Sequence, residues 1–442
     1  MSRSDGKIKK LFSYIVNQDY IFSVISKFTG VFISLVYSII LNRYLGAELK
    51  GELAIISNYA TIISSVLCFG MYQAYPFYKK REGDVFYPFI NTITSFYILA
   101  FVVFVASAVF LPIGMNLRVA LCLVPVRSYI RHINYVVTIE RPKTRNIASI
   151  IIDVTDVCTV ACFWIFTDAS YTYVVTLLAV LTIVSFSISF ANLRMALSKF
   201  RFTLKLLLKY ATFGFVPMIT LLLMTINYRV DVIMLEKYTV VSMAQIGIYS
   251  VGVSLAEKVW LIPDAVKDIL LSRLCKEKGR GEEEVAKIIR INLVVTVATV
   301  LFTALVSKPF VNIVYGEEYL GADVITVIML AGVIGMIFYK MVYSYNVSLG
   351  KRAVNLTFLG VAAAVNVIGN LIFIPSFGIY GAALTSVISY TLCGICFLVY
   401  FKCVSGVPLR RMLFIQKEDI ALIKELLGKL KKKKVKAPSD DV

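Results

Sequence analysis

Eight charged side chains stand inside apolar stretches of this sequence, where an unneeded charge is costly. Five are cations, namely Lys27, Arg127, Arg131, Lys258 and Lys340, and three are acids, namely Asp153, Asp156 and Glu257. A charge at the centre of a membrane-spanning helix costs about 2.5–3.5 kcal/mol on insertion scales. Such groups normally face the interior of a helix bundle or a water-filled path. Their types and positions therefore indicate binding of a charged molecule or ion.

The cations outnumber the acids and suit an anionic cargo. Lys27 shares one helix face with Gly30, Ser34 and Tyr37, so polar and small groups lie beneath it. Arg127 and Arg131 are one helical turn apart. Arginine and lysine pair strongly with phosphate oxygens, and a pyrophosphate offers many of these. We predict that Lys27, Arg127, Arg131, Lys258 and Lys340 line a cationic lumen that opens to the cytoplasm.

The three acids leave two interpretations open. They can neutralise the nearby cations in a structural network, or they can carry a coupling ion, because the pKa of a buried carboxyl can approach neutrality. The sequence has no G-x-x-x-x-G-K-[ST] phosphate loop that would bind nucleotide. An ion gradient is therefore the expected energy source, with Asp153, Asp156 and Glu257 as candidate carriers of a proton or sodium ion.

Other patterns predict lumen lining and flexible points. Asn58, Thr61, Ser65 and Tyr72 recur at spacings of three, four and seven residues and would line the lumen, although they could instead form helix–helix hydrogen bonds. Pro125, Gly214 and Pro217 are predicted hinges, because proline interrupts helical hydrogen bonding.

Enzymatic chemistry has little support in the sequence. No nucleophile–base pair or metal-ligand cluster is recognisable, and there is a single histidine, His132. Cys393 and Cys396 have the C-x-x-C spacing, but they lie inside an apolar stretch with no histidine or acid nearby. We expect neither a metal, nor a cofactor, nor a catalytic residue.

The elements that carry these residues are membrane spans. The chain has 442 residues, of which 59% are hydrophobic, and a mean hydropathy of +0.79. Stretches of about twenty apolar residues cross a bilayer as helices. We predict an all-α membrane protein with twelve spans, at residues 21–41, 53–76, 86–113, 117–139, 147–167, 171–193, 206–228, 241–263, 287–307, 322–346, 354–374 and 381–404.

The loops determine the predicted topology. Roughly 35 of the 46 basic residues fall in segments on one side of the predicted spans, and roughly 6 fall in loops on the other, which places both termini in the cytoplasm. The tail has an apolar helical face followed by Lys431–Lys434, which is typical of binding to anionic inner-leaflet lipids. This distribution of the +19 net charge argues against nucleic acid as a partner.

The chain divides at its midpoint. The basic loop 194–209 separates two sets of six spans that both start inside, so we expect parallel repeats related by a pseudo-two-fold axis along the membrane normal. The predicted domains are a cytoplasmic segment at 1–20, an N-lobe at 21–200, a C-lobe at 201–404 and a basic amphipathic tail at 405–442.

Several motifs resemble those of polysaccharide flippases. These are Arg43-Tyr44-Leu45-Gly46 with Gly51, then Tyr315-Gly316-Glu317-Glu318-Tyr319, and the segment Gly378-Ile379-Tyr380-Gly381-Ala382-Ala383. The likeness extends over residues 15–405 and is to the Wzx-type O-antigen or capsule flippases of the multidrug/oligosaccharidyl-lipid/polysaccharide (MOP) exporter superfamily.

The resemblance implies a V-shaped arrangement of two lobes, like that of the MATE exporters, and alternating access in the bacterial inner membrane. The implied cargo is an undecaprenyl-diphosphate-linked oligosaccharide moved from the inner to the outer leaflet. A polysaccharide polymerase and a chain-length regulator are the implied partners. Lys27 matches the place of a first-span cation in the family. Two alternatives within the superfamily stay open, a cation-coupled multidrug exporter and a lipid II flippase.

Overall fold

The structure is a computed structural model that describes residues 18–193, 203–276, 281–416 and 419. The side chains of residues 18–28 and of a few positions in 192–276 are outside the described part. The predicted N-terminal segment, most of the midpoint loop and most of the basic tail therefore lie outside the described residues as well.

The described residues form helices and no strand, which confirms the prediction of an all-α membrane protein. The α-helices are α2 (Gln18–Leu67), α3 (Ala74–Glu82), α4 (Phe86–Phe110), α5 (Met115–Glu140), α6 (Pro142–Phe166), α7 (Tyr171–Leu193), α8 (Leu204–Glu236), α9 (Met243–Lys258), α10 (Leu261–Lys276), α11 (Glu282–Phe310), α12 (Ala322–Ser348), α13 (Arg352–Ser405) and α14 (Leu409–Leu413). Short helical turns occur at η1 (Met71–Gln73), η3 (Val311–Tyr315) and η4 (Glu317–Tyr319).

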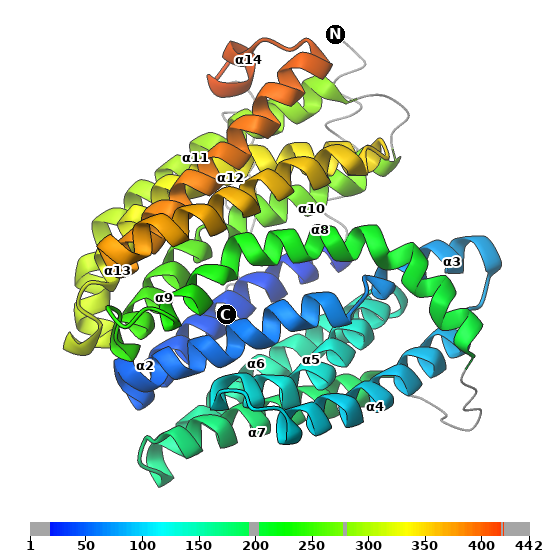
Figure 1. Cartoon of the computed structure of the whole chain (residues 1–442). Coiled ribbons are helices and arrows are strands. Elements are labelled where there is room, and N and C mark those ends of the chain that lie inside the picture. The colour runs from blue at the N-terminus through cyan, green and yellow to red at the C-terminus, as the bar shows by residue number, and fades with distance from the viewer. Residues whose placement is uncertain (1–17, 194–202, 277–280, 417–418, 420–442) are drawn as a thin grey trace, which may run out of the picture. The chain divides into compact units, whose positions relative to one another are not determined.

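Within the described part, 8 helices are long and apolar enough to cross a membrane. Two of these helices, α2 and α13, have 50 and 54 residues, and each contains a glycine with non-helical backbone angles. Figure 1 shows both helices reversing direction along their length, so each can supply two crossings. The arrangement is compatible with twelve spans and makes the chain a multi-pass membrane protein.

The outward faces of these helices are apolar, as lipid contact requires. Exposed side chains include Ile98, Leu99 and Val102 on α4 and Phe302 and Leu305 on α11. A water-soluble protein rarely exposes so much contiguous apolar surface.

The described helices group into two compact units. Unit 1 contains residues 1–251, 309–322 and 367–382, and unit 2 contains residues 252–308, 323–366 and 383–442. α8 and most of α9 fall in unit 1. The division into an N-lobe and a C-lobe at residue 200 stays a prediction.

The bend of α2 in unit 1 depends on Gly46. This glycine has a positive φ of 67°, a backbone angle that residues other than glycine rarely adopt. A Cβ at this position would lie 2.6 Å from Oε2 of Glu318. The same carboxylate accepts a 3.1 Å hydrogen bond from the backbone N–H of Ala47. The residues after the bend are therefore capped by a side chain from a distant segment.

Arg43 fastens that distant segment to α2. Its Nε and Nη2 donate hydrogen bonds of 2.6 and 2.7 Å to the carbonyl oxygens of Val314 and Ile313. Tyr319 donates a 3.0 Å hydrogen bond to the carbonyl oxygen of Asn42. Two of the motifs that carry the family resemblance are thus in direct contact, and their role here is structural.

After its bend, α2 packs against the start of α9 through glycines. A Cβ at Gly247 would lie 1.9 Å from the carbonyl oxygen of Ala47. A Cβ at Gly51 would lie 2.1 Å from the carbonyl oxygen of Met243. Only hydrogen atoms fit between the two backbones at these points, which is typical of close helix pairs in membranes.

The predicted hinge residues of α8 have two different surroundings. Pro217 lies inside the helix, and Figure 1 shows α8 changing direction along its length, as proline commonly causes. Gly214 is a contact point: a Cβ there would lie 2.1 Å from the carbonyl oxygen of Phe69. Pro125 also lies inside its helix, α5.

In unit 2, a buried ion pair fastens the segment after α13. Asp419 accepts hydrogen bonds from Nε and Nη2 of Arg290, the latter at 2.9 Å. Burial alone would raise the pKa of Asp419, but the hydrogen bonds from Arg290 outweigh it and hold that pKa below its usual range. The beginning of the predicted tail domain is therefore anchored to α11.

The glycine contact between α2 and α9 can be tested by one methyl group. We expect Gly247→Ala to lower the free energy of unfolding by about 1–3 kcal/mol, because the backbones must separate to admit the Cβ. Thermal unfolding in detergent measures this. Gly114→Ala is the matched control, since nothing lies within 4 Å of a Cβ there. Equal melting temperatures for both variants would contradict the close packing.

Candidate functional site

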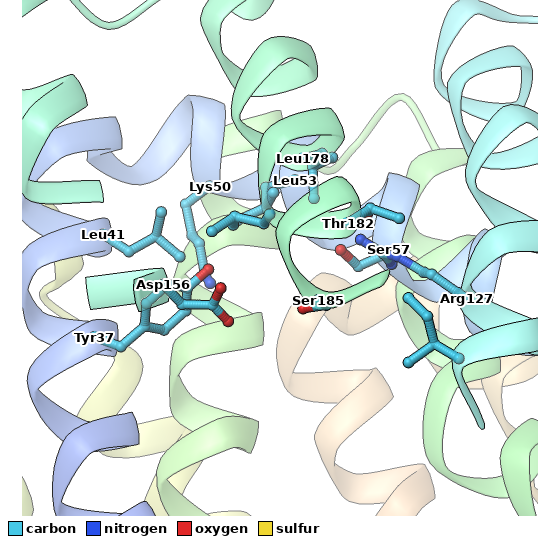
Figure 2. A pocket seen from close by; sticks show the side chains of 12 residues that line it. Tyr37, Leu41, Lys50, Leu53, Ser57, Arg127, Asp156, Leu178, Thr182 and Ser185 are labelled. Atoms are coloured by element: carbon cyan, nitrogen blue, oxygen red, sulfur yellow. The ribbon is translucent and has the colours of Figure 1, made fainter. Parts of the chain in front are cut away.

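A cavity of about 420 Å³ lies among α2, α5, α6 and α7 of unit 1. Its volume is within the range of small-molecule sites in proteins. Polar groups are Tyr37, Lys50, Ser57, Arg127, Asp156, Thr182 and Ser185, and apolar walls come from Leu41, Leu53, Ile130, Leu178 and Leu181. Figure 2 shows these side chains gathered around the cavity.

Arg127 supplies a positive charge to this cavity. It projects from the middle of α5, directly after an apolar stretch of that helix. Within the part of the chain that the structure describes, its guanidinium forms no ion pair with a carboxylate. A carboxylate therefore does not contact Arg127 directly among the described residues, although Asp156 lies in the same cavity. Whether the acids neutralise Arg127 or carry an ion stays open. The polar groups that line the cavity must therefore offset the free-energy cost of burying this charge.

A second charged group of the cavity is Asp156 on α6. One of its carboxylate oxygens, Oδ1, is buried and accepts no hydrogen bond from any described residue. Figure 2 places Asp156 near Tyr37 and Lys50, with Arg127, Ser57 and Thr182 at the other end of the cavity. The cavity thus has one carboxylate and two cationic side chains.

Lys50 is the cavity residue that sequence analysis missed. It lies within α2, just after the bend at Gly46. Lys50, Leu53 and Ser57 are spaced three and four residues apart, so they share one helix face. This periodicity was the available signal. Thr182 and Ser185 gave no comparable signal, because isolated hydroxyls are common in membrane helices.

Leu41 and Lys50 lie on either side of the bend of α2 at Gly46, which joins the two spans at their outer ends in the predicted topology. The opening of a cationic lumen to the cytoplasm stays a prediction.

Arg131 and Asp153 are not among the lining residues of this cavity. Nη1 of Arg131 lies 3.9 Å from Sγ of Cys68. The Asp153 carboxylate lies against α2, since a Cβ at Gly30 would be 3.2 Å from its Oδ2. Its electrostatic partner is Arg145.

The residues of the predicted polar stripe are not among the lining residues of this cavity. Asn58, Thr61 and Ser65 on α2 donate hydrogen bonds of 2.6 to 2.7 Å to carbonyl oxygens of their own helix. The ring of Tyr72 in η1 packs against His132 and Tyr135, with centroids 5.7 and 4.9 Å away. A role for these four residues in lining a lumen stays a prediction.

Lys340 and Lys258 belong to unit 2. Nζ of Lys340 is 2.7 Å from Oδ2 of Asp264 and 4.6 Å from the ring centroid of Trp260. Lys340 is 4% exposed, whereas the side chain of Asp264 is 43% exposed. Glu257 and Lys258 are the last two residues of α9. Lys340 therefore has a carboxylate partner, which Arg127 lacks among the described residues.

Lys27 lies in α2, but its side chain is outside the described residues. A role for Lys27 in a cationic lumen stays a prediction. No group of three or more histidine, cysteine, aspartate or glutamate side chains suited to a metal ion occurs in the described part of the chain.

Sequence comparison with known families gives a match over more than half of the chain. Residues 84–323 match the family described as polysaccharide biosynthesis protein. The chain belongs to this family. The predicted resemblance is confirmed at this level, and the Wzx subgroup stays a prediction. An uncharacterized membrane protein of Methanocaldococcus jannaschii is 27% identical over 106 residues, which cover 24% of this chain and 21% of that protein.

Solved structures of MOP-superfamily transporters share the fold of this polysaccharide biosynthesis protein. The lipid II flippase MurJ has a TM-score of 0.67 at 16% identity, covering 93% of this chain and 96% of MurJ. A multidrug resistance MATE transporter has a TM-score of 0.65 at 13% identity, covering 87% of this chain and 98% of that chain. Because one fold hosts several cargoes, these likenesses show the architecture alone.

The cavity of this family member can hold a polar molecule with a negative group. Arg127 and Lys50 offer donors to anionic oxygens, and the hydroxyls of Ser57, Thr182 and Ser185 can exchange hydrogen bonds with polar substituents. The leucine walls can contact the apolar face of a ring. These properties favour binding and transport over covalent chemistry.

The contacts of Lys340 predict a structural role for this residue. We expect Lys340→Ala to lower the melting temperature of the purified protein, because it removes the buried partner of Oδ2 of Asp264 and leaves a gap beside Trp260, while Lys267 still contacts Oδ1 of Asp264. Lys402→Ala, which removes an exposed lysine, should leave the melting temperature unchanged. A Lys340→Ala protein as stable as the parent would mean that the ion pair contributes little.

Proposed function

We propose that the chain is a flippase that moves an undecaprenyl-diphosphate-linked oligosaccharide from the inner to the outer leaflet of the bacterial inner membrane. The family match supports a task in polysaccharide biosynthesis. The architecture it shares with transporters supports alternating access. Neither observation specifies the cargo, so the chemistry of the cavity carries the remainder of the proposal.

The observation that favours an anionic cargo is the unpaired Arg127 in a cavity that also contains Lys50. A guanidinium binds phosphate or carboxylate oxygens through two parallel hydrogen bonds. An anionic group would supply the partner that Arg127 lacks among the described residues. In this proposal, the hydroxyls and leucines contact the sugar portion of the cargo, and Lys27, Arg131 and Lys258 contribute positive potential along the path. Lys340, which is paired with Asp264, has a structural role instead.

The two alternatives predict different recognition. A cation-coupled multidrug exporter would need a cavity of net negative charge, and this cavity has two cations and one acid. A MOP-superfamily transporter from Pyrococcus furiosus, described as having a binding pocket of reverse polarity, has a TM-score of 0.53 and 13% identity, covering 88% of this chain and 95% of that chain. Lipid II is itself a diphosphate-linked cargo, so only the sugar portion would distinguish it.

The proposal is tested by loss of surface polysaccharide. We expect Arg127→Ala to reduce export at least about tenfold in a strain lacking the native gene, because it removes a charge-assisted contact with the cargo. Lys50→Ala should reduce export less, and Arg127→Lys should restore part of it, since lysine keeps the charge without the fork geometry.

Arg410→Ala is the matched control, because Arg410 is exposed and lies outside the cavity. Membrane abundance is measured for each variant by immunoblot. Full export by Arg127→Ala together with Lys50→Ala would rule out the cationic cargo site. Altered efflux of cationic dyes would instead favour the drug-exporter alternative.

We propose further that transport is driven by a proton or sodium gradient, with Asp156 as the principal carrier and Asp153 and Glu257 as additional candidates. The buried Oδ1 of Asp156, without a described partner, supports this assignment. Binding of a cation there would satisfy the carboxylate inside an apolar wall.

The coupling assignment is tested in vesicles. We expect a protonophore or a sodium ionophore to stop transport in the parent, and Asp156→Asn to abolish the dependence on that gradient, because an amide cannot carry the ion. Asp168→Asn is the control, since Asp168 is exposed in the loop between α6 and α7. Transport by Asp156→Asn that still follows the gradient would exclude Asp156 as the carrier.

A further inference from the structure

A hydrogen-bonded network connects the ends of α5, α7 and α8 to α2 within unit 1, and none of its members is cationic. Tyr59 donates a 2.7 Å hydrogen bond to Oε2 of Glu236. Nδ2 of Asn116 donates to Oε2 of Glu52 at 2.6 Å and to Oε1 of Glu236 at 3.4 Å. Tyr171 donates a 2.9 Å hydrogen bond to Oδ1 of Asn116. The network joins α2, α5, α7 and α8.

All of these ends lie on one side of the predicted topology. Asn116 and Tyr171 are near the first residues of α5 and α7, and Glu236 is the last residue of α8. Glu52 follows the bend of α2 at Gly46. The positive-inside distribution assigns these positions to the outer face.

The network uses every polar group of Asn116. Both of its N–H bonds donate to carboxylates, and its carbonyl oxygen accepts from a tyrosine. Glu52 and Glu236 are therefore close neighbours, and no cation pairs with either of them among the described residues. Repulsion between the two carboxylates opposes the hydrogen bonds that hold them.

This balance distinguishes the network from the contacts at the bend of α2. At the bend, Arg43 donates to two neutral backbone carbonyls. No like charges in these contacts push the two segments apart. In the network, hydrogen bonds hold the helix ends together while like charges weaken the hold. Such a contact can form and break within a transport cycle.

The same part of α2 carries one face of the cavity. Lys50, Leu53 and Ser57 line the cavity, while Glu52 and Tyr59 form the network. Moving α2 away from α8 would therefore move a wall of the cavity.

We propose that Glu52, Tyr59, Asn116, Tyr171 and Glu236 form a reversible outer latch, whose opening gives the cavity of unit 1 access to the outer side. The directional role rests on the proposed flippase function, but the latch itself does not. It holds the end of α8 against α2 and α5 when closed.

The latch is tested by hydrogen–deuterium exchange on the full-length protein in nanodiscs, without cargo or gradient. We expect Tyr59→Phe and Asn116→Ala to speed amide exchange in the last two turns of α8 about tenfold, because each removes a hydrogen bond to a charged group. Tyr173→Phe is the matched control. Its hydroxyl makes no contact with the network, and it should leave this exchange unchanged.

Glu52→Gln distinguishes a reversible latch from a fixed structural contact. This change removes the repulsion and keeps an acceptor for Asn116, so we expect slower exchange at the end of α8. Faster exchange in Glu52→Gln, or unchanged exchange in both Tyr59→Phe and Asn116→Ala, would overturn the proposal. If Tyr59→Phe also speeds exchange across α12, that variant destabilises the protein as a whole. The exchange rates of Asn116→Ala and Glu52→Gln at the end of α8 then test the latch. A protein that transports no oligosaccharide can still show the latch, so the two proposals fail separately.

Discussion

A charged side chain inside an apolar bundle has to find either an opposite charge or a polar space, and this constraint separates the cations of this protein. Lys340 is buried against Asp264 and the ring of Trp260, which satisfies its charge within unit 2. Arg127 has no such partner among the described residues and faces a cavity instead. Both are single positive charges in apolar helices, but only one of them is available to an external anion.

The helix α2 connects most features of unit 1. Its bend at Gly46 is capped by Glu318 and fastened by Arg43, which gives the later residues of the helix a defined direction. One face beyond the bend carries Lys50 and Ser57 into the cavity, and another carries Glu52 and Tyr59 into the outer network. If both proposals hold, the part of α2 beyond the bend links cargo recognition on one face to closure on another.

The family and the fold define different parts of the functional problem. Membership of the polysaccharide biosynthesis family specifies a cellular task. The likeness to MurJ and MATE transporters shows a shared architecture and leaves the cargo open. The charged and hydroxyl groups of the cavity are the remaining evidence about the cargo, because proteins of one fold differ in function through the groups that line their sites.

The sequence by itself determined the all-α membrane architecture, because hydropathy over about twenty residues is a local property that each helix expresses alone. It also identified Arg127 and Asp156, since a charge in an apolar stretch is conspicuous whatever surrounds it. The pairing of Lys340 with Asp264 and the entry of Lys50 into the cavity were decided by the tertiary structure. These outcomes depend on how helices cross and bend, and contacts between residues far apart in the chain leave no trace in local periodicity.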